Sequence, residues 1–487
     1  MKDILQTINR YSVIYPNKIA IRYNDHSLTY KQLDTYANAL ACYIMSSRTP
    51  LILYGHMSPY MIVGMLASLK AGCGYIPLDI SMPTARLQHI INKVEPNFVL
   101  NTTSDEIELT NGEIITIDDL QQMSVTTREF NNIQEVDIAY TIFTSGTTGE
   151  PKGVQISYGS LNEFVKWISD INQLGLYQHW LNQAPFSFDL SVMAIYPCLT
   201  TAGTLHLVDK HMVAKPQLLD DLLRSNNINI WVSTPSFMEL ALLLPVFTQE
   251  KYESLGQFIF CGEVLSHKLA EKLLHHFNKA VVYNTYGPTE ATVAVTGIQI
   301  TQSIIQHYNP LPVGKPRAGV TLAVNDHAEL IIMGRCLSQG YLNDAIKTAQ
   351  VFKEYQGKQA YYTGDSAYYL DDMWFIKGRM GNQIKYNGYR IELEDIEFRL
   401  RQIHFIQEAI VVPKVKQGKV VQLIAAITLT KAVSPEEVKV LKSEITPLLA
   451  ENLPTYMLPT KYEILEKLPI NGNGKVDRKA INEVILR

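Results

Sequence analysis

Residues 144–153 read Thr-Ser-Gly-Thr-Thr-Gly-Glu-Pro-Lys-Gly and follow the apolar run IAYTIF. Glycines allow the backbone N–H groups of a loop to turn toward one anion, and the hydroxyl groups add further donors. Lys152 adds a positive charge. The segment therefore suits the β- and γ-phosphates of a nucleotide, although it lacks the Walker A pattern. A flexible surface turn is the alternative interpretation, since Gly, Ser and Thr are ordinary loop residues.

The segment YNTYGPTE, residues 283–290, ends a second apolar run. It places aromatic rings, an amide, hydroxyl groups and a carboxylate within eight residues. A ring and an amide can hold a purine, while a hydroxyl and a carboxylate can hold a phosphate and its Mg²⁺, which prefers oxygen ligands. An ordinary turn with an exposed acid is the alternative.

Two shorter signals complete the set. In Tyr362-Thr363-Gly364-Asp365, the acid after a glycine turn can accept hydrogen bonds from two ribose hydroxyls. In the Gly-rich loop at 471–475, Lys475 can be carried into a site, where its charge would stabilise charge that develops during nucleotidyl transfer. Taken alone, the first is a common turn and the second a solvated lysine.

The elements that must position these residues alternate along the chain. Short apolar runs at 51–55, 98–101 and 280–283 alternate with helical patterns such as 59–71, which predicts α/β layers with parallel sheets. Short strands between about 310 and 375 predict a small β-rich subdomain. Beyond Gly378, a helix from Leu393 to Ile403, two strands and a helix opened by Ser434 predict a separate α+β piece.

The expected fold class is thus α/β. A large N-terminal domain of αβ layers with a β-rich subdomain, residues 1–379, precedes a small α+β C-terminal domain, residues 382–487, on a pliable hinge at 379–382.

Composition excludes several classes of function. The 487 residues are 46% hydrophobic and carry a net charge of −4, which disfavours disorder and nucleic acid as the main partner. Five dispersed cysteines without a C-x-x-C favour neither a disulfide scaffold nor a cysteine-rich zinc site, and they suit a reducing cytoplasm. Neither a signal peptide nor a transmembrane segment is expected. A Ser-His-Asp hydrolase lacks the G-x-S-x-G pattern.

Five motifs in order resemble the adenylate-forming superfamily, which includes adenylation domains of nonribosomal peptide synthesis, acyl-CoA ligases and luciferases. They are TSGTTGEPKGV, YNTYGPTEATV, YYTGDSA, GRMGNQIKYNGYRIELEDIE and LPINGNGKVDRKAI, and the segments LTYKQL and LKAGCGYIPLD are also similar. The resemblance spans nearly the whole chain. It implies that a carboxylate attacks the α-phosphorus of ATP to give an acyl adenylate and pyrophosphate.

The resemblance also implies roles for single residues. Asn284 would bond the adenine amino group, Tyr286 would pack on the ring, Asp365 would bind the ribose with help from Arg379, and Glu290 would help hold Mg²⁺. Lys475, the expected catalytic residue, would bridge the substrate carboxylate and the α-phosphate. The complete expected ATP site is Thr144, Ser145, Asn284, Thr285, Tyr286, Gly287, Pro288, Thr289, Asp365, Arg379 and Lys475.

Substrate choice is expected to rest on PFSFDLSVMAIYP, residues 185–197. In superfamily members that activate amino acids, the acid matching Asp189 pairs with the substrate's α-ammonium group, and a buried carboxylate needs such a partner. A solvent-facing aspartate that caps a helix is the alternative. The expected walls of the pocket are uncharged and suit a small neutral side chain: Leu190, Met193, Cys261, Val293 and Ala294.

The segment FCGEVL around Cys261 is similar to superfamily members that activate D-alanine. Those enzymes load it onto the phosphopantetheine thiol of a small carrier protein for D-alanylation of lipoteichoic acid. The sulfur of Cys261 would then select one enantiomer, or else Cys261 is simply a small buried residue.

Other interpretations stay open. A stand-alone adenylation enzyme for another small amino acid, in nonribosomal peptide or siderophore synthesis, is the nearest alternative. An acyl-CoA ligase is disfavoured by Asp189, and a catalytically silent nucleotide-binding protein by the joint presence of Lys475, Glu290 and Asp365. One departure from the superfamily is Gly381, which stands where many members carry a hinge aspartate.

Overall fold

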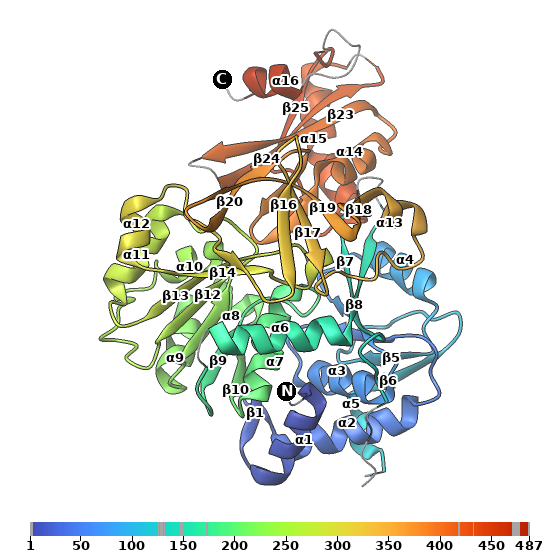
Figure 1. Cartoon of the computed structure of the whole chain (residues 1–487). Helices are drawn as coiled ribbons and strands as arrows, with labels where there is room; N and C mark the ends of the chain where they lie inside the picture. The colour runs from blue at the N-terminus through green and yellow to red at the C-terminus, as the bar shows by residue number, and fades with distance from the viewer. Residues whose placement is uncertain are drawn as a thin grey trace. The chain divides into compact units, whose positions relative to one another are not determined.

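The computed structural model describes residues 3–124, 126, 130, 132–146, 150–171, 174–416, 419–431, 433–469 and 478–485. Within these residues the chain packs as two compact units, shown in Figure 1. The first contains Met1–Ile80, Lys93–Ile142 and Gly153–Gly378, and the second contains Ser81–Asn92, Phe143–Lys152 and Arg379–Arg487. The division into two domains at residues 379–382 stays a prediction.

The largest sheet of the first unit has nine strands in the described part of the chain. Its central strands run parallel, and the edge pairs β1–β2, β13–β14 and β14–β15 are antiparallel. In spatial order the strands are β15 (Lys315–Pro316), β14 (Thr296–Ile300), β13 (Val281–Tyr286), β12 (Gln257–Phe260), β11 (Ile230–Ser233), β9 (His179–Asn182), β10 (Thr204–Leu207), β1 (Ile19–Tyr23) and β2 (His26–Thr29).

A second sheet contains six of the described strands. Its order is β6 (Glu113–Thr116), β5 (Phe98–Asn101), β3 (Leu51–Gly55), β4 (Tyr75–Asp79), β7 (Ile138–Thr144) and β8 (Lys152–Ser157). The four pairings from β6 to β7 are parallel. The parallel sheets predicted from the apolar runs are confirmed, and β3 and β5 have the predicted bounds.

Both large sheets reverse their direction of winding once near the middle. The chain moves from β3 to its neighbour β4 and then returns to β5 on the other side of β3. In the nine-stranded sheet it likewise moves from β9 to β10 and then to β11 on the other side of β9. In parallel α/β sheets, ligands bind beyond the carboxyl ends of the strands at such crossover points.

Helices connect these strands. α3 (Pro59–Ala71) begins where Ser58 caps the first turn and Pro59 occupies it, and it ends at Gly72 in a left-handed conformation, as predicted for 59–71. The other helices of the first unit are α1 (Ile4–Ile14), α2 (Tyr30–Ile44), α5 (Ile117–Gln122), α6 (Tyr158–Ile171), α7 (Val192–Thr200), α8 (Lys210–Ala214), α9 (Pro216–Ser225), α10 (Pro235–Ala241), α11 (His267–His276), α12 (Gln302–His307) and α13 (Ala345–Val351). Helix α4 (Thr84–Val94) has residues in both units.

The main core of the first unit joins the two large sheets. One buried cluster includes Leu53 of β3, Leu205 of β10, Phe164 of α6 and Ile195 of α7. Burial of such side chains is the main stabilising contribution to folding. Its packing fixes the strand ends that carry the candidate site.

The β-rich subdomain predicted between 310 and 375 is confirmed as a five-stranded antiparallel sheet within the described residues. Its strands are β16 (Val320–Val324), β17 (Glu329–Gly334), β18 (Phe352–Tyr355), β19 (Lys358–Leu370) and β20 (Met373–Arg379). Leu330 and Ile332 of β17 lie in one buried cluster with Tyr286 of β13. The subdomain is thereby packed onto the nine-stranded sheet.

The second unit is α+β, as predicted for the C-terminal part. The capping box of α15 is formed by Ser434 and Glu437. Its elements are the hairpin β21 (Gln383–Tyr386) and β22 (Tyr389–Glu392), the sheet β23 (Ile406–Lys416), β24 (Lys419–Leu429) and β25 (Lys461–Ile464), and the helices α14 (Leu393–Arg401), α15 (Pro435–Ala450), η3 (Thr455–Met457) and α16 (Arg478–Ile485). α14 buries Leu393, Ile396 and Leu400 of the predicted stripe but ends at Arg401, two residues before Ile403, where the chain turns toward β23.

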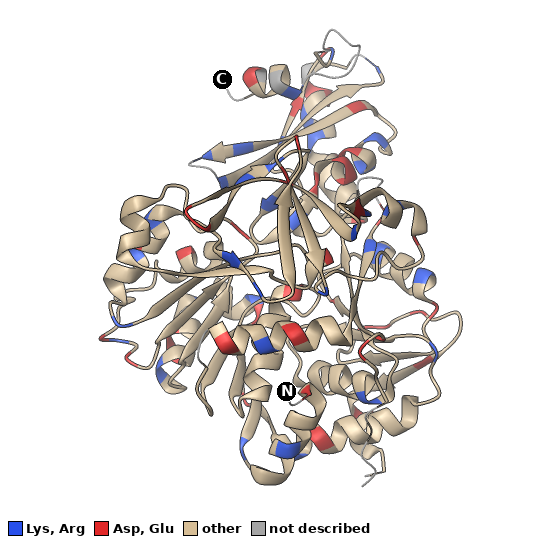
Figure 2. Ribbon diagram, viewed as in Figure 1, with Lys and Arg blue, Asp and Glu red and all other residues tan. Residues whose placement is uncertain are grey.

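Charges of both signs are interspersed along the ribbon of each unit in Figure 2, in agreement with the low net charge of −4. All five cysteines are free. Among the residues that the structure describes, no helix is long and apolar enough to cross a membrane.

Candidate active site

Strand β13 and the short helix η2 (Thr289–Ala291) carry the predicted nucleotide segment 284–290. The aromatic and β-branched residues of β13 favour a strand, and its carboxyl end leads directly into the loop at Gly287. A Cβ atom at Gly287 would lie 2.5 Å from the Cα of Ala294, so only glycine permits this close approach. Because the loop folds back so tightly, the nucleotide segment lies against residues 293–294 of the expected amino-acid pocket.

Tyr286 and Asp365 are brought together from distant parts of the chain. The Tyr286 hydroxyl donates to Oδ2 of Asp365 at 2.5 Å, and both residues are buried. Asp365 lies on β19 and is held by its backbone N–H, which donates to Oγ1 of Thr363. The expected adenine-stacking ring and the expected ribose-binding acid are therefore direct neighbours.

The side chains of Asn284 and Thr285 are engaged inside the fold. The Asn284 amide nitrogen donates to the Pro312 carbonyl at 2.8 Å, so the amide oxygen is the end suited to accept from an adenine amino group. The Thr285 hydroxyl donates to the Phe260 carbonyl at 2.8 Å. Thr285 thus anchors the end of β12, after which Cys261 follows.

Glu290 is fully buried on η2. Its Oε1 accepts a hydrogen bond from the Tyr341 hydroxyl at 2.9 Å, and its backbone carbonyl accepts from Ser338 N–H at 2.8 Å. Within the described residues, no group of three or more His, Cys, Asp or Glu could hold a metal ion. A single carboxylate of this kind fits Mg²⁺, which is commonly bound by one or two carboxylates together with substrate phosphates.

A strained turn follows Glu290. Thr292 and Val293 both adopt left-handed backbone conformations, with φ of 59° and 64°, which is rare for β-branched residues. The Thr292 hydroxyl donates to the Cys336 carbonyl at 2.7 Å, and Ala294 N–H donates to the Thr292 carbonyl at 2.7 Å. Such strain persists where the surroundings over-determine it and is concentrated at functional sites.

Asp189 begins the short helix η1 (Asp189–Ser191), directly before α7, and is half-buried. The N-cap residues of η1 and α7 are Phe188 and Ser191, and neither makes a side-chain cap hydrogen bond. Burial, and next the negative charge of Asp189, raises the pKa of the Tyr140 hydroxyl well above its usual value. Tyr140 on β7 is thus a neighbour of Asp189 that the sequence did not single out.

The five expected pocket walls belong to one buried cluster: Leu190, Met193, Cys261, Val293 and Ala294. The Cys261 thiol points to the Val293 carbonyl, with 3.7 Å between sulfur and oxygen. Cys261 follows β12 and Val293 belongs to the strained turn, so two separate backbone segments fix the position of the sulfur. That these residues line an amino-acid pocket stays a prediction.

Arg317 is a further buried residue that sequence reasoning missed. It is 3% exposed, and burial lowers the pKa of its guanidinium. Its Nε and Nη2 have no hydrogen-bond partner among the described residues. Its backbone N–H donates to the Val295 carbonyl, just beyond the strained turn. No local pattern marks this arginine, because its burial results from long-range packing.

The remaining expected residues lie in the second unit or outside the described residues. Thr144 ends β7, and Arg379 ends β20. The Ser145 hydroxyl donates to the Arg390 carbonyl at 2.9 Å and accepts from Glu392 N–H. Lys475 lies outside the described residues, which break off between 469 and 478.

The fold and this site define an α/β protein with two buried carboxylates beside the strand ends. Comparison with known proteins gives the class. The family described as "AMP-binding enzyme" matches residues 10–354, and "AMP-binding enzyme C-terminal domain" matches residues 395–475. The chain belongs to the family of AMP-binding enzymes, which confirms the resemblance to adenylate-forming enzymes.

Full-length relatives are more specific. A protein of Staphylococcus epidermidis named D-alanine–D-alanyl carrier protein ligase is 51% identical over 485 residues, covering 100% of both chains. A protein of the same name from Staphylococcus aureus strain Newman is 52% identical over 487 residues, again covering 100% of both.

Solved structures show the same fold. The adenylation domain AlmE of Vibrio cholerae, in complex with glycyl-adenosine-5'-phosphate, is similar with a TM-score of 0.85 at 22% identity, covering 99% of this chain and 97% of that one. PA1221, a nonribosomal peptide synthetase protein with adenylation and peptidyl carrier domains, has a TM-score of 0.81 at 25% identity, covering 99% and 84%. The expected α/β fold class is confirmed.

The contact between Glu290 and Tyr341 gives a testable prediction. Tyr341→Phe removes the donor to a fully buried carboxylate, and we expect the free energy of unfolding in urea to fall by about 1.5–3 kcal/mol. Tyr308→Phe is the matched control, because the Tyr308 hydroxyl donates to Asp371 in an exposed contact. It should cost less than about 0.5 kcal/mol. Equal losses for the two variants would contradict the assigned importance of the buried contact.

Proposed function

We propose that this chain uses ATP to activate D-alanine as D-alanyl-AMP. It then transfers the D-alanyl group to the phosphopantetheine thiol of a small carrier protein, for D-alanylation of lipoteichoic acid. The observation that carries the proposal is the identity of 51–52% over the full length of both chains with relatives named D-alanine–D-alanyl carrier protein ligase. The buried, uncharged pocket walls beside Asp189 support it independently.

In the first step, a carboxylate oxygen of D-alanine attacks the α-phosphorus of ATP, and the bond to pyrophosphate breaks. We assign Asn284 to the adenine amino group, Tyr286 to the ring and Asp365 with Arg379 to the ribose. Thr144, Ser145, Thr285, Gly287, Pro288 and Thr289 complete the proposed ATP site. Lys475 would bridge the substrate carboxylate and the α-phosphate, where its charge stabilises the transition state.

Mg²⁺ is part of this proposal. Glu290 would hold the ion, which would supply charge neutralisation on the phosphates when bound. Tyr341 orients the Glu290 carboxylate through its hydrogen bond to Oε1. The role of the chain is thus to present one fixed oxygen ligand.

For the amino acid, Asp189 would pair with the α-ammonium group. Cys261 and Val293 would enclose the methyl group, and the sulfur would crowd the position that an L side chain needs. The absence of charge among the five walls suits alanine better than charged substrates.

In the second step, the carrier thiol attacks the carbonyl carbon of the adenylate, the C–S bond forms and AMP leaves. The chemistry needs no cysteine of this chain. We propose a cytoplasmic location, because ATP is a cytoplasmic substrate and all five cysteines are free.

An amino-acid panel tests the proposed substrate. ATP–pyrophosphate exchange is measured with D-alanine, L-alanine, glycine and serine, each at the same concentrations. We expect D-alanine to give the highest kcat/KM. A higher value for another small amino acid would favour an adenylation enzyme of peptide or siderophore synthesis instead.

The role of Asp189 is tested by two substitutions. Asp189→Ala removes the carboxylate, and Asp189→Asn keeps its shape without the charge. Because the lost interaction is with the α-ammonium group, the KM for D-alanine should rise about 10-fold or more in both variants, while the KM for ATP changes little. If both KM values rise equally, Asp189 does not bind the amino acid.

Lys475 is tested by the same exchange reaction. Lys475→Ala removes the charge that is proposed to stabilise the transition state, and exchange should fall about 100-fold or more. Lys467→Ala is the control, since Lys467 is an exposed lysine nearby in the sequence. Near-wild-type exchange in Lys475→Ala would refute the proposed catalytic role.

A further inference from the structure

The crossover points of the two large sheets carry a polar cluster that the proposed adenylation step does not use. His56 directly follows β3, which pairs with β5 at the crossover of the six-stranded sheet, and Asp79 ends β4 on the other side of β3. Asn182 ends β9, which pairs with β11 at the crossover of the nine-stranded sheet, and Lys210 begins α8 shortly after β10. His56 and Asn182 thus each follow or end a strand at a position where parallel sheets commonly bind ligands, and they lie in one cluster.

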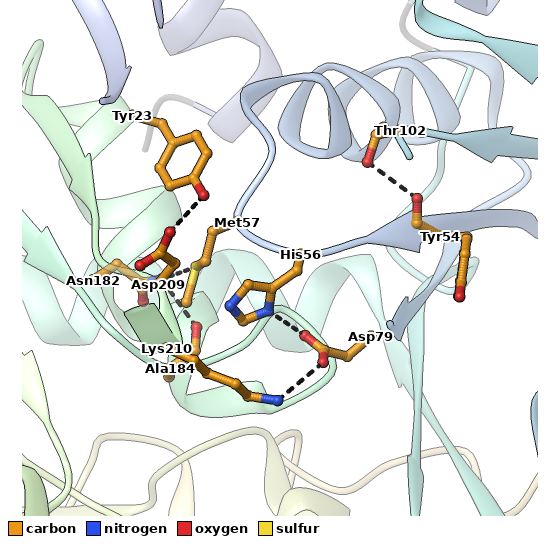
Figure 3. A network of polar contacts seen from close by, with 10 residues as sticks. All are labelled: Tyr23, Tyr54, His56, Met57, Asp79, Thr102, Asn182, Ala184, Asp209 and Lys210. Atoms are coloured by element: carbon orange, nitrogen blue, oxygen red, sulfur yellow. Dashed lines mark hydrogen bonds and ion pairs between the residues drawn. The ribbon is translucent and has the colours of Figure 1, made fainter. Parts of the chain in front are cut away.

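Figure 3 shows how these side chains lie. Nδ1 of His56 is 2.6 Å from Oδ2 of Asp79, and Nζ of Lys210 is 3.5 Å from the other carboxylate oxygen. The side chains of His56 and Asp79 are only 11% and 8% exposed. Nearby, Asp209 accepts a hydrogen bond from the Tyr23 hydroxyl and caps α8. Asp79 is therefore the carboxylate that orients the imidazole, and Lys210 balances its charge.

Two buried acceptor atoms of the cluster have no hydrogen-bond donor among the described residues. With Nδ1–H donating to Asp79, Nε2 of His56 carries a lone pair, and this buried atom has no partner among the described residues. The Asn182 side chain is fully buried. Its nitrogen donates to the Ala184 carbonyl at 3.0 Å and lies 3.8 Å from the Met57 sulfur, whereas its Oδ1 has no partner in the described part of the chain. Two buried acceptors without donors fit an incoming N–H, O–H or S–H group.

The backbone is strained at the same place. Met57, next to His56 in the chain, has a φ of 49° and is 1% exposed. A buried methionine in the left-handed region is costly, and such strain is concentrated at functional sites. Met57 and Ala184 belong to the same buried cluster as the expected pocket walls, and the Asn182 amide donates to the Ala184 carbonyl just before the segment that leads to Asp189.

The thioester step of the proposed function requires a base that removes the proton of the attacking thiol, and this cluster contains a suitable group. A thiol with a pKa of about 8.5 is mostly protonated at neutral pH, and only the thiolate is a good nucleophile. An imidazole oriented by a carboxylate is the common protein base for activating such a group. At the site described above, Asp365 and Glu290 already accept hydrogen bonds from Tyr286 and Tyr341.

Resting on the proposed function, we propose that His56, oriented by Asp79, is the general base of the transfer step. As the thiol sulfur attacks the carbonyl carbon of D-alanyl-AMP, its proton passes to Nε2 of His56. The C–S bond forms, the bond between the carbonyl carbon and the AMP oxygen breaks, and AMP leaves with the electron pair. His56 later returns the proton to solvent.

The test separates transfer from activation. D-Alanyl-AMP is formed on the full-length enzyme with ATP, Mg²⁺ and pyrophosphatase and then mixed rapidly with pantetheine as the thiol. We expect His56→Ala to slow thioester formation about 100-fold or more, with a far smaller effect on ATP–pyrophosphate exchange. Tyr23→Phe is the matched control, since it alters a hydrogen bond to Asp209 and leaves His56 and Asp79 in place; it should slow neither reaction.

Two further measurements distinguish a base from a structural residue. Imidazole added to His56→Ala should restore part of the transfer rate. An aromatic thiol that is already ionised at neutral pH should react with His56→Ala nearly as fast as with the wild type, because no proton has to be removed.

Each other outcome decides the proposal. Equal losses of exchange and transfer in His56→Ala, or the same loss with the ionised thiol, would show a structural role and overturn it. If His56→Ala does not fold, Asp79→Asn takes its place, and equal losses there have the same meaning. A wild-type enzyme with no D-alanine-dependent exchange would instead overturn the proposed function, so the two failures are distinguishable.

Discussion

A carboxylate removed from water is stable only where a donor or a cation faces it, and this requirement organises the first unit. Glu290 receives the Tyr341 hydroxyl, Asp365 receives the Tyr286 hydroxyl, and Asp79 receives the His56 ring. In each pair the partner comes from a different element. Each acid therefore ties two segments of the chain together.

The order of the strands decides where these pairs lie. Parallel strands end at one edge of a sheet, so β12 and β13 bring Cys261 and Asn284 to the same edge although 22 residues separate them. The two crossover points add His56 and Asn182, and Asp79 ends the strand next to β3. The residues proposed for adenylation and the proposed base of the transfer step thus follow from the same topological rule.

Some of the left-handed non-glycine residues of the chain lie beside these two sites. Thr292 and Val293 turn sharply between Glu290 and the pocket wall, and Met57 turns sharply beside His56. A hydrogen bond from the Thr292 hydroxyl holds the first turn, which contains left-handed β-branched residues. A contact from the Asn182 amide to the sulfur of Met57 holds the second turn. Packing supports both turns. The strain keeps Val293 and His56 in positions that relaxed backbone would not reach.

The sequence by itself determined many of the elements and supplied the hypotheses about the chemistry. The predicted bounds of β3, β5 and α3 are those of the structure, because their apolar patterns and caps are local signals. It also predicted the segment 284–290 and Asp365, since glycine turns next to polar side chains can be recognised without neighbours. Only the tertiary structure decided that Tyr341 donates a hydrogen bond to Glu290 and that Arg317 is buried. It also decided that His56, directly after β3, contacts Asp79 at the end of the neighbouring strand β4. Those contacts join residues far apart in the chain, and long-range packing, which no local pattern records, brings them together.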